Sequence, residues 1–166
     1  MKALVGIIMG SDSDSAVMAE ATKVLQQFGV SYEIGVYSAH RSPHRTLEYV
    51  STARARGLKV IIAGAGSSAH LAGVTAAETI LPVIGVPIDS SPLSGLDALM
   101  ATVQMPPGVP VATVAIGKPG ATNAGVLAAQ MIALGDPGVA ARLVAYKKKL
   151  ADKVEDAARR LEQGGS

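Results

Sequence analysis

The feature that most constrains the fold of this chain is a set of five short apolar runs. Each run is followed by a turn and then by a segment with apolar residues at helical spacing. The runs cover residues 3–9, 31–37, 59–63, 82–86 and 110–116. Such continuous apolar runs are typical of strands that are buried on both faces. Their alternation with helices predicts a parallel sheet with helices on both sides. Since crossovers between parallel strands are right-handed, we expect a five-stranded, three-layer, flavodoxin-like α/β sandwich.

Apolar residues at helical spacing separate these runs and predict the helices of the outer layers. We expect Ser13 or Asp14 to cap the first helix, and the second to begin at Pro43 with Ser42 as its cap. Further helices are expected over residues 70–80, 96–103 and 123–134, with a turn over residues 117–120 before the last of these.

The end of the chain predicts a longer helix. Over residues 136–162, apolar positions three, four or seven apart form one face, and the other face is charged. Such a helix could project from the domain or clamp a neighbouring subunit. Residues 163–166 are expected to form a frayed tail. Because no linker or repeat interrupts the pattern, we expect residues 1–166 to form a single domain.

The balance of apolar and charged residues suggests that this domain associates with copies of itself. Hydrophobic residues make up 49% of the chain and charged residues 17%, whereas about 25% charged is typical of soluble domains. Small apolar surfaces pack closely, so the surplus favours buried subunit interfaces. The alternative is an alanine-rich monomer.

Charge and composition also exclude several classes of protein. The net charge is +2, and no basic run is interleaved with aromatic residues, so nucleic acid is not an expected partner. The chain has no cysteine, which excludes disulfides, thiol nucleophiles and thiolate metal sites. No apolar run reaches the ~18 residues of a membrane span. Without a signal pattern at its start, the chain is expected in the cytoplasm.

The residues that carry chemistry fall in the loops that follow the first three predicted strands. These loops are Gly10–Asp14, Ser38–Ser42 and Gly64–His70. In a doubly wound sheet, ligands bind beyond the carboxyl ends of the strands, where the strand order reverses. Small residues let backbone N–H groups approach an anion, and hydroxyl and guanidinium groups suit a phosphate. The loops therefore predict a pocket for a nucleotide or a sugar phosphate.

Each of these features also has a plainer interpretation. The Gly10–Asp14 stretch could be a tight turn with a helix cap, in which Asp12 is only solvated. His40 could be an ordinary loop histidine, and His70 could be packed and bonded to backbone. His44 is expected on the surface. With three scattered histidines and no cysteine we expect no metal site, and the dinucleotide-binding fingerprint is incomplete.

Over almost its whole length, the chain resembles the PurE family, and specifically class I N5-carboxyaminoimidazole ribonucleotide mutases of purine biosynthesis. Ser38-Ala39-His40-Arg41 is the most telling motif. The others, in the family's order, are Gly10-Ser11, Asp12-Ser13-Asp14, Gly64-Ala65-Gly66, Ala69-His70-Leu71, Val103-Gln104-Met105-Pro106 and Asn123-Ala124.

The resemblance implies an isomerase that forms a homo-octamer with sites near subunit contacts, and that needs no cofactor. It implies that His40 is the catalytic histidine. Substrate-binding residues would be Gly10, Ser11, Asp14, Ser38, Arg41, Ser67, Ser68 and His70. Ser11 and Arg41 would contact the substrate phosphate and the nucleotide, and Asp14 would contact a ribose hydroxyl.

The third loop departs from the family's usual sequence. Ser67, Ser68 and Ala72 stand where Gly, Ala and Pro are usual, which leaves details of the pocket for the migrating carboxyl group open. The related class that fixes free carbon dioxide usually has Lys after the histidine of the second loop and lacks the His-Leu pair. With Arg41 and His70, this chain resembles class I on both points.

The implied reaction moves a carboxyl group from an exocyclic nitrogen to a ring carbon, with one group that first donates and later accepts a proton. Histidine suits both steps at neutral pH. Two rivals are a flavin-binding electron carrier of the same fold and a carboxylase that acts on another nucleotide. The scarcity of aromatic residues disfavours the first. A purely structural oligomer would leave the His40-Arg41 pair unexplained.

Overall fold

The computed structural model describes residues 2–164, in which five parallel strands form one sheet. The strands are β1 (Val5–Met9), β2 (Tyr32–Val36), β3 (Val60–Gly66), β4 (Val83–Ile88) and β5 (Ala112–Thr113). Their order across the sheet is β2-β1-β3-β4-β5. The order reverses between β1 and β3, because the chain moves from β1 outward to β2 and then returns. The predicted parallel α/β sheet is confirmed.

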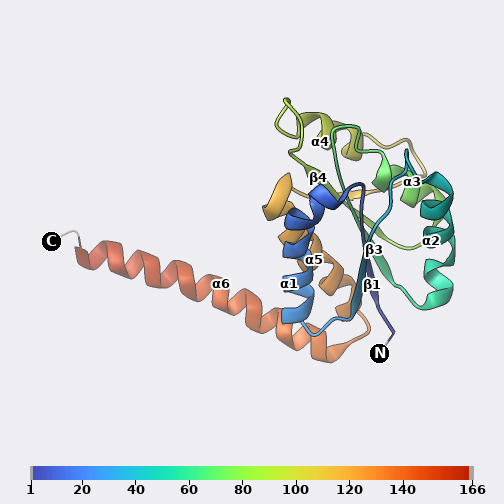
Figure 1. Ribbon diagram of the computed structural model, residues 1–166. Helices are drawn as coiled ribbons and strands as arrows, with labels where there is room; N and C mark the ends of the chain where they lie inside the picture. The colour runs from blue at the N-terminus through green and yellow to red at the C-terminus, as the bar shows by residue number, and fades with distance from the viewer. Residues whose placement is uncertain (1, 165–166) are drawn as a thin grey trace.

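Helices cover both faces of this sheet and complete the expected three layers (Figure 1). The structure contains α1 (Ser15–Gln27), α2 (Pro43–Arg56), α3 (Leu71–Glu78), α4 (Leu96–Val103), α5 (Gly117–Ala133) and α6 (Pro137–Gly164). The core under one face contains residues of α1, α5 and the start of α6. The core under the other face contains residues of α2, α3 and α4.

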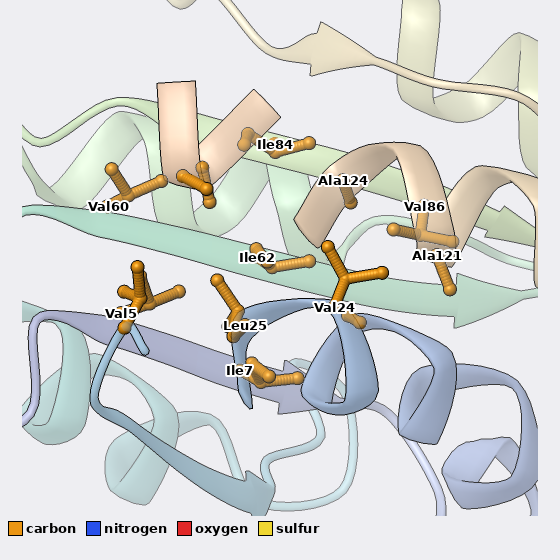
Figure 2. Packing of buried hydrophobic residues seen from close by; sticks show 14 of the residues in the cluster. Val5, Ile7, Val24, Leu25, Val60, Ile62, Ile84, Val86, Ala121 and Ala124 are labelled. Carbon is orange, nitrogen blue, oxygen red and sulfur yellow. The ribbon is translucent and has the colours of Figure 1, made fainter. Parts of the chain in front are cut away.

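Alternating residues of the central strands supply these two cores. In β1, Ile7 belongs to the core under α1 and α5, whereas its neighbour Ile8 belongs to the core under α2 and α3, as period-2 geometry requires. Both side chains are fully buried. In Figure 2, Ile7, Ile62 and Ile84 lie on successive strands facing Leu25 and Ala124. The buried centre of the sheet thus carries the loops that follow β1, β3 and β4.

Two expectations for the region after α4 were wrong. The strand expected over residues 110–116 is reduced to Ala112–Thr113, which pairs only with Ile84 and Gly85 of β4. The turn expected over residues 117–120 is instead the first turn of α5. A proline is tolerated there because the first N–H groups of a helix have no intrahelical partner. Gly120 allows that turn to lie against the Ala115 carbonyl, which an added Cβ would strike.

The long final helix is confirmed, and most of it projects from the domain (Figure 1). Its first turns are anchored by Val139 and Leu143, which are buried. Farther along, Val154 is 70% exposed and Leu161 is 78% exposed. Of the expected tail, residues 163–164 are helical, whereas residues 165–166 lie outside the described residues. Within residues 2–164, no helix combines the length and apolar character needed to cross a membrane.

Candidate active site

A cleft of about 290 Å³ lies at the carboxyl ends of the strands, where the strand order reverses. Eight of the nine residues predicted as site residues line it. They are Gly10, Ser11, Asp14, Ser38, His40, Arg41, Ser67 and Ser68. The ninth, His70, does not line the cleft but is hydrogen-bonded to His40. Residues from three separate loops therefore meet at one place.

The first loop forms a short 3-10 turn, Asp12–Asp14, whose cap is Ser11. The Ser11 N–H donates to Asp14 Oδ2 at 3.1 Å, and the Ser13 N–H donates to Ser11 Oγ at 3.4 Å. Asp14 occupies the N-cap position of α1, as expected, but its side chain makes no cap hydrogen bond to that helix and accepts the Ser11 N–H instead. The loop is therefore a tight turn with a cap, but Asp12 is not only solvated, because it accepts hydrogen bonds from the Ser13 N–H and the Ser11 hydroxyl. Ser11, Ser13 and Asp14 also line the cleft.

Asp14 is the one acidic side chain buried in the structure, with 4% of its surface exposed, among residues 2–164. Burial raises the pKa of its carboxyl group above the usual value of 3.8. The hydrogen bond from the Ser11 N–H and the positive charge of Arg41 act in the opposite direction and favour the carboxylate. A carboxylate held at the floor of a cleft can accept hydrogen bonds from hydroxyl groups of a ligand.

Arg41 joins the second loop to the first. One terminal nitrogen of its guanidinium group donates to the Gly10 carbonyl at 2.8 Å, and its Nε lies 3.5 Å from Ser38 Oγ. The buried Thr46 hydroxyl donates to the Ser38 carbonyl at 3.1 Å and fixes the loop from below. Ser42 occupies the N-cap position of α2 with Pro43 after it, but its hydroxyl bonds Ser38 rather than capping the helix.

The two histidines of the site form a pair. His40 Nε2 and His70 Nδ1 are 2.8 Å apart, and the two rings are perpendicular, with centroids 5.0 Å apart. A hydrogen bond of this kind holds one proton between the two nitrogens, so one ring donates and the other accepts. His70 is itself held at the N-cap position of α3. The arrangement can orient the His40 ring and exchange a proton with it.

The third loop follows β3 and leaves the strand through an unusual backbone conformation. Ser67 has a φ of +49°, in the left-handed region that residues other than glycine and asparagine seldom occupy. Just before it, Gly66 lies beside Ser90 of the loop after β4, and a Cβ on Gly66 would strike the Ser90 hydroxyl. The glycine thus lets two strand ends approach each other at the base of the cleft.

Ser90 is the cleft residue that sequence reasoning most clearly missed. It lines the cleft together with Ser67 and Ser68. It follows β4, which is the fourth strand to end at this edge. The signal that could have found it is its position, since the segment after every parallel strand is a candidate for ligand contact.

A larger hollow, about 530 Å³, lies between β2 and α2. Arg45 lies over the ring of Tyr37, and Arg56 lies over the ring of Tyr49 and pairs with Glu33 at 3.0 Å. None of the predicted site residues lines this hollow, and the smaller cleft is therefore the candidate active site. Within residues 2–164, no group of three or more acidic or histidine side chains could hold a metal ion.

Comparison with protein families gives a match to the AIR carboxylase family over residues 4–153. The chain is 55% identical over 164 residues to N5-carboxyaminoimidazole ribonucleotide mutase of Pyrococcus horikoshii, covering 99% of this chain and 92% of that protein. It is 58% identical over 143 residues to the Bacillus subtilis protein of the same name, covering 86% of this chain and 88% of that protein.

A solved structure matches both the sheet and its helices. Treponema denticola PurE superposes with a TM-score of 0.86 at 28% sequence identity, covering 95% of this chain and 97% of that one. The likeness therefore includes the elements that carry the cleft.

Proposed function

Because this chain belongs to the AIR carboxylase family, we propose that it is an N5-carboxyaminoimidazole ribonucleotide mutase of purine biosynthesis in which His40 carries the proton. The observation that carries the assignment of the reaction is 54–58% identity to mutases of that name over most of both chains. The role of His40 is supported by its position in the cleft and its hydrogen bond to His70.

The reaction is an isomerisation, so every atom of the substrate is kept. Protonation of the carbamate nitrogen allows its bond to carbon to break, which releases carbon dioxide within the cleft. The ring carbon then attacks this carbon dioxide, and the proton on that carbon is removed. One group can serve both proton transfers if it donates in the first and accepts in the second.

His40 is suited to this double role because an imidazole nitrogen that carries a proton can donate it, and the same nitrogen can then accept a proton. The bond to His70 leaves the Nδ1 atom of His40 as the nitrogen with no hydrogen-bond partner among residues 2–164. That nitrogen is available to the substrate. His70 keeps the ring oriented and offers a second place for the proton between the two transfers.

The other loops would hold the ribonucleotide. The Ser11 hydroxyl and the Arg41 guanidinium group are suited to its phosphate, which can come close to the backbone at Gly10 because glycine has no side chain, and Asp14 is suited to a ribose hydroxyl. Ser67 and Ser68 are suited to the migrating carboxyl group, with Ser38 supporting Arg41. Fixing the ring in this way supplies a large part of catalysis, and the chemistry requires no cofactor.

We further propose that each subunit is a single catalytic domain, residues 1–166, and that eight subunits form a homo-octamer. The projecting α6, with Val154 and Leu161 exposed, supports contacts between subunits.

The test of the function is turnover of the purified protein with the carbamate substrate in the absence of bicarbonate. We expect 4-carboxyaminoimidazole ribonucleotide as the product, and no acceleration by added bicarbonate. The competing outcome is that the enzyme uses free carbon dioxide as the carboxyl donor. The altered third loop is the specific reason to test it, since Ser67 and Ser68 could bind free carbon dioxide instead. A strict requirement for bicarbonate, without conversion of the carbamate, would assign the chain to the carboxylating class.

A further inference from the structure

Beside the cleft lies a second hollow, about 430 Å³, that belongs to the same surface. Gly10, Ser11, Ser38 and Arg41 line both. The hollow extends from the cleft to the first turn of α2, where Arg45 lines both this hollow and the larger one between β2 and α2. Because it begins at the residues proposed to bind phosphate, an anionic group held there would be within reach of α2.

Arg45, in the first turn of α2, and Arg41, in the loop just before that helix, line the same hollow. Their hydrogen bonding differs. Arg41 uses its guanidinium group to join the Gly10 carbonyl and Ser38. Arg45 forms no ion pair and no side-chain hydrogen bond with residues 2–164, but its guanidinium carbon lies 4.9 Å from the centre of the Tyr37 ring. Stacking on an aromatic ring orients a guanidinium group while leaving its N–H donors available.

The charge in the hollow is suited to a dianion. Two guanidinium groups face one carboxylate, that of Asp12. That carboxylate accepts hydrogen bonds from the Ser13 N–H and the Ser11 hydroxyl, so the turn itself already occupies it. Guanidinium groups match the oxygens of a phosphate in both charge and geometry.

We propose that Arg45 is a second phosphate-binding arginine, and that it makes the enzyme selective for phosphorylated over unphosphorylated substrate. The inference rests on the proposed function, which supplies a ribonucleotide. Arg41 fixes the two loops and offers its remaining donors to the phosphate, whereas Arg45, oriented by Tyr37, approaches the phosphate from the side of α2.

The test compares Arg45→Gln with the wild-type enzyme by calorimetry, using aminoimidazole ribonucleotide and the nucleoside that lacks its phosphate. Loss of one exposed charge-assisted contact should weaken binding of the ribonucleotide about tenfold, with no change for the nucleoside. In the mutase reaction, KM should rise by a similar factor while kcat stays within about twofold.

Arg54→Gln is the matched control, because Arg54 is an exposed arginine of α2 that lines neither hollow. Nine residues beyond Arg45, it lies on the opposite side of the helix. Ribonucleotide affinity of Arg45→Gln within about twofold of this control would overturn the proposal. An equal loss for the nucleoside would also overturn it, because the effect would then not depend on phosphate.

Calorimetry separates this inference from the proposed reaction. A wild-type enzyme that binds the ribonucleotide but does not convert the carbamate would contradict the mutase assignment and leave the selectivity of Arg45 measurable. A wild-type enzyme that binds no ribonucleotide would overturn both.

Discussion

At the scale of single residues, the hydrogen bond between His40 and His70 is the feature on which the proposed chemistry depends. His40→Asn should lower turnover by at least ~100-fold, the usual weight of a general acid–base group. Affinity for the ribonucleotide should stay near the wild-type value, because the phosphate and ribose contacts come from other side chains. Steady-state kinetics and calorimetry on the same preparation check both expectations.

His44→Asn is the matched control, since His44 is an exposed histidine of α2 that lines neither the cleft nor its neighbouring hollow. Its activity should equal that of the wild type. Near-normal turnover in His40→Asn would remove His40 from the mechanism.

The residues of the site could be predicted from the sequence more completely than their contacts. Eight predicted residues line one cleft because parallel strands all end at the same edge of the sheet. The pairing of His40 with His70 could not be predicted, because these residues are 30 positions apart and only the loop conformations bring their rings together. Ser90 was missed because it reaches the cleft only through the close approach of its loop to Gly66, which the sequence does not show.

At the scale of elements, the approach of β3 to the end of β4 depends on Gly66. Gly66→Ala should destabilise the protein by about 1–3 kcal/mol, because the new methyl group meets the Ser90 hydroxyl and the loop must shift. Turnover should fall as well, since both strand ends border the cleft. Chemical denaturation and kinetics provide the measurements.

When Ser90→Gly is combined with Gly66→Ala, it should recover most of the lost stability, because it removes the two nearest atoms, Ser90 Oγ and Cβ, and leaves only the Ile88 carbonyl oxygen at 3.1 Å from the methyl group. Gly135→Ala is the control, since an added Cβ there has open space. If the double variant is no more stable than Gly66→Ala, steric conflict with Ser90 is not the cause.

Elements were predictable where burial imposes a strong pattern. β1, β3 and β4 are fully or almost fully buried, and their apolar runs are evident in the sequence. β5 is a short edge strand whose residues are not buried, so the apolar run over residues 110–116 overestimated its length. The start of α5 was misjudged because Gly117 and Pro119 resemble turn residues. Gly117 does turn the chain, with a φ of +72°, but α5 begins there, and Pro119 fits its first turn.

At the scale of the whole molecule, the apolar face of α6 predicts that copies of the chain associate with one another. Leu150, Val154 and Leu161 are spaced to share one side of the helix, and all three are exposed. Light scattering at micromolar concentration should give the mass of an octamer. Val154→Glu should reduce that mass, because a charge on this face would have to be buried in the interface.

The control is Glu155→Lys, which changes the charge of α6 on its other side and should leave the mass unchanged. A monomer mass for the wild-type protein would contradict the proposed octamer and the interpretation of the apolar surplus. An octamer that Val154→Glu leaves intact would show that α6 does not hold the subunits together.

The stability of the outer part of α6 as a helix should also depend on the concentration of the protein. Local ion pairs, such as Lys148 with Asp152 and Arg159 with Asp156, support it, but pairs of this kind contribute only ~0.5 kcal/mol or less each. A helical segment that packs against nothing is only marginally stable in water, because most of the stability of a helix in a protein comes from tertiary packing. The helical content of this segment should therefore fall as the protein is diluted. Dissociation of the subunits and unfolding of this part of α6 would then occur together.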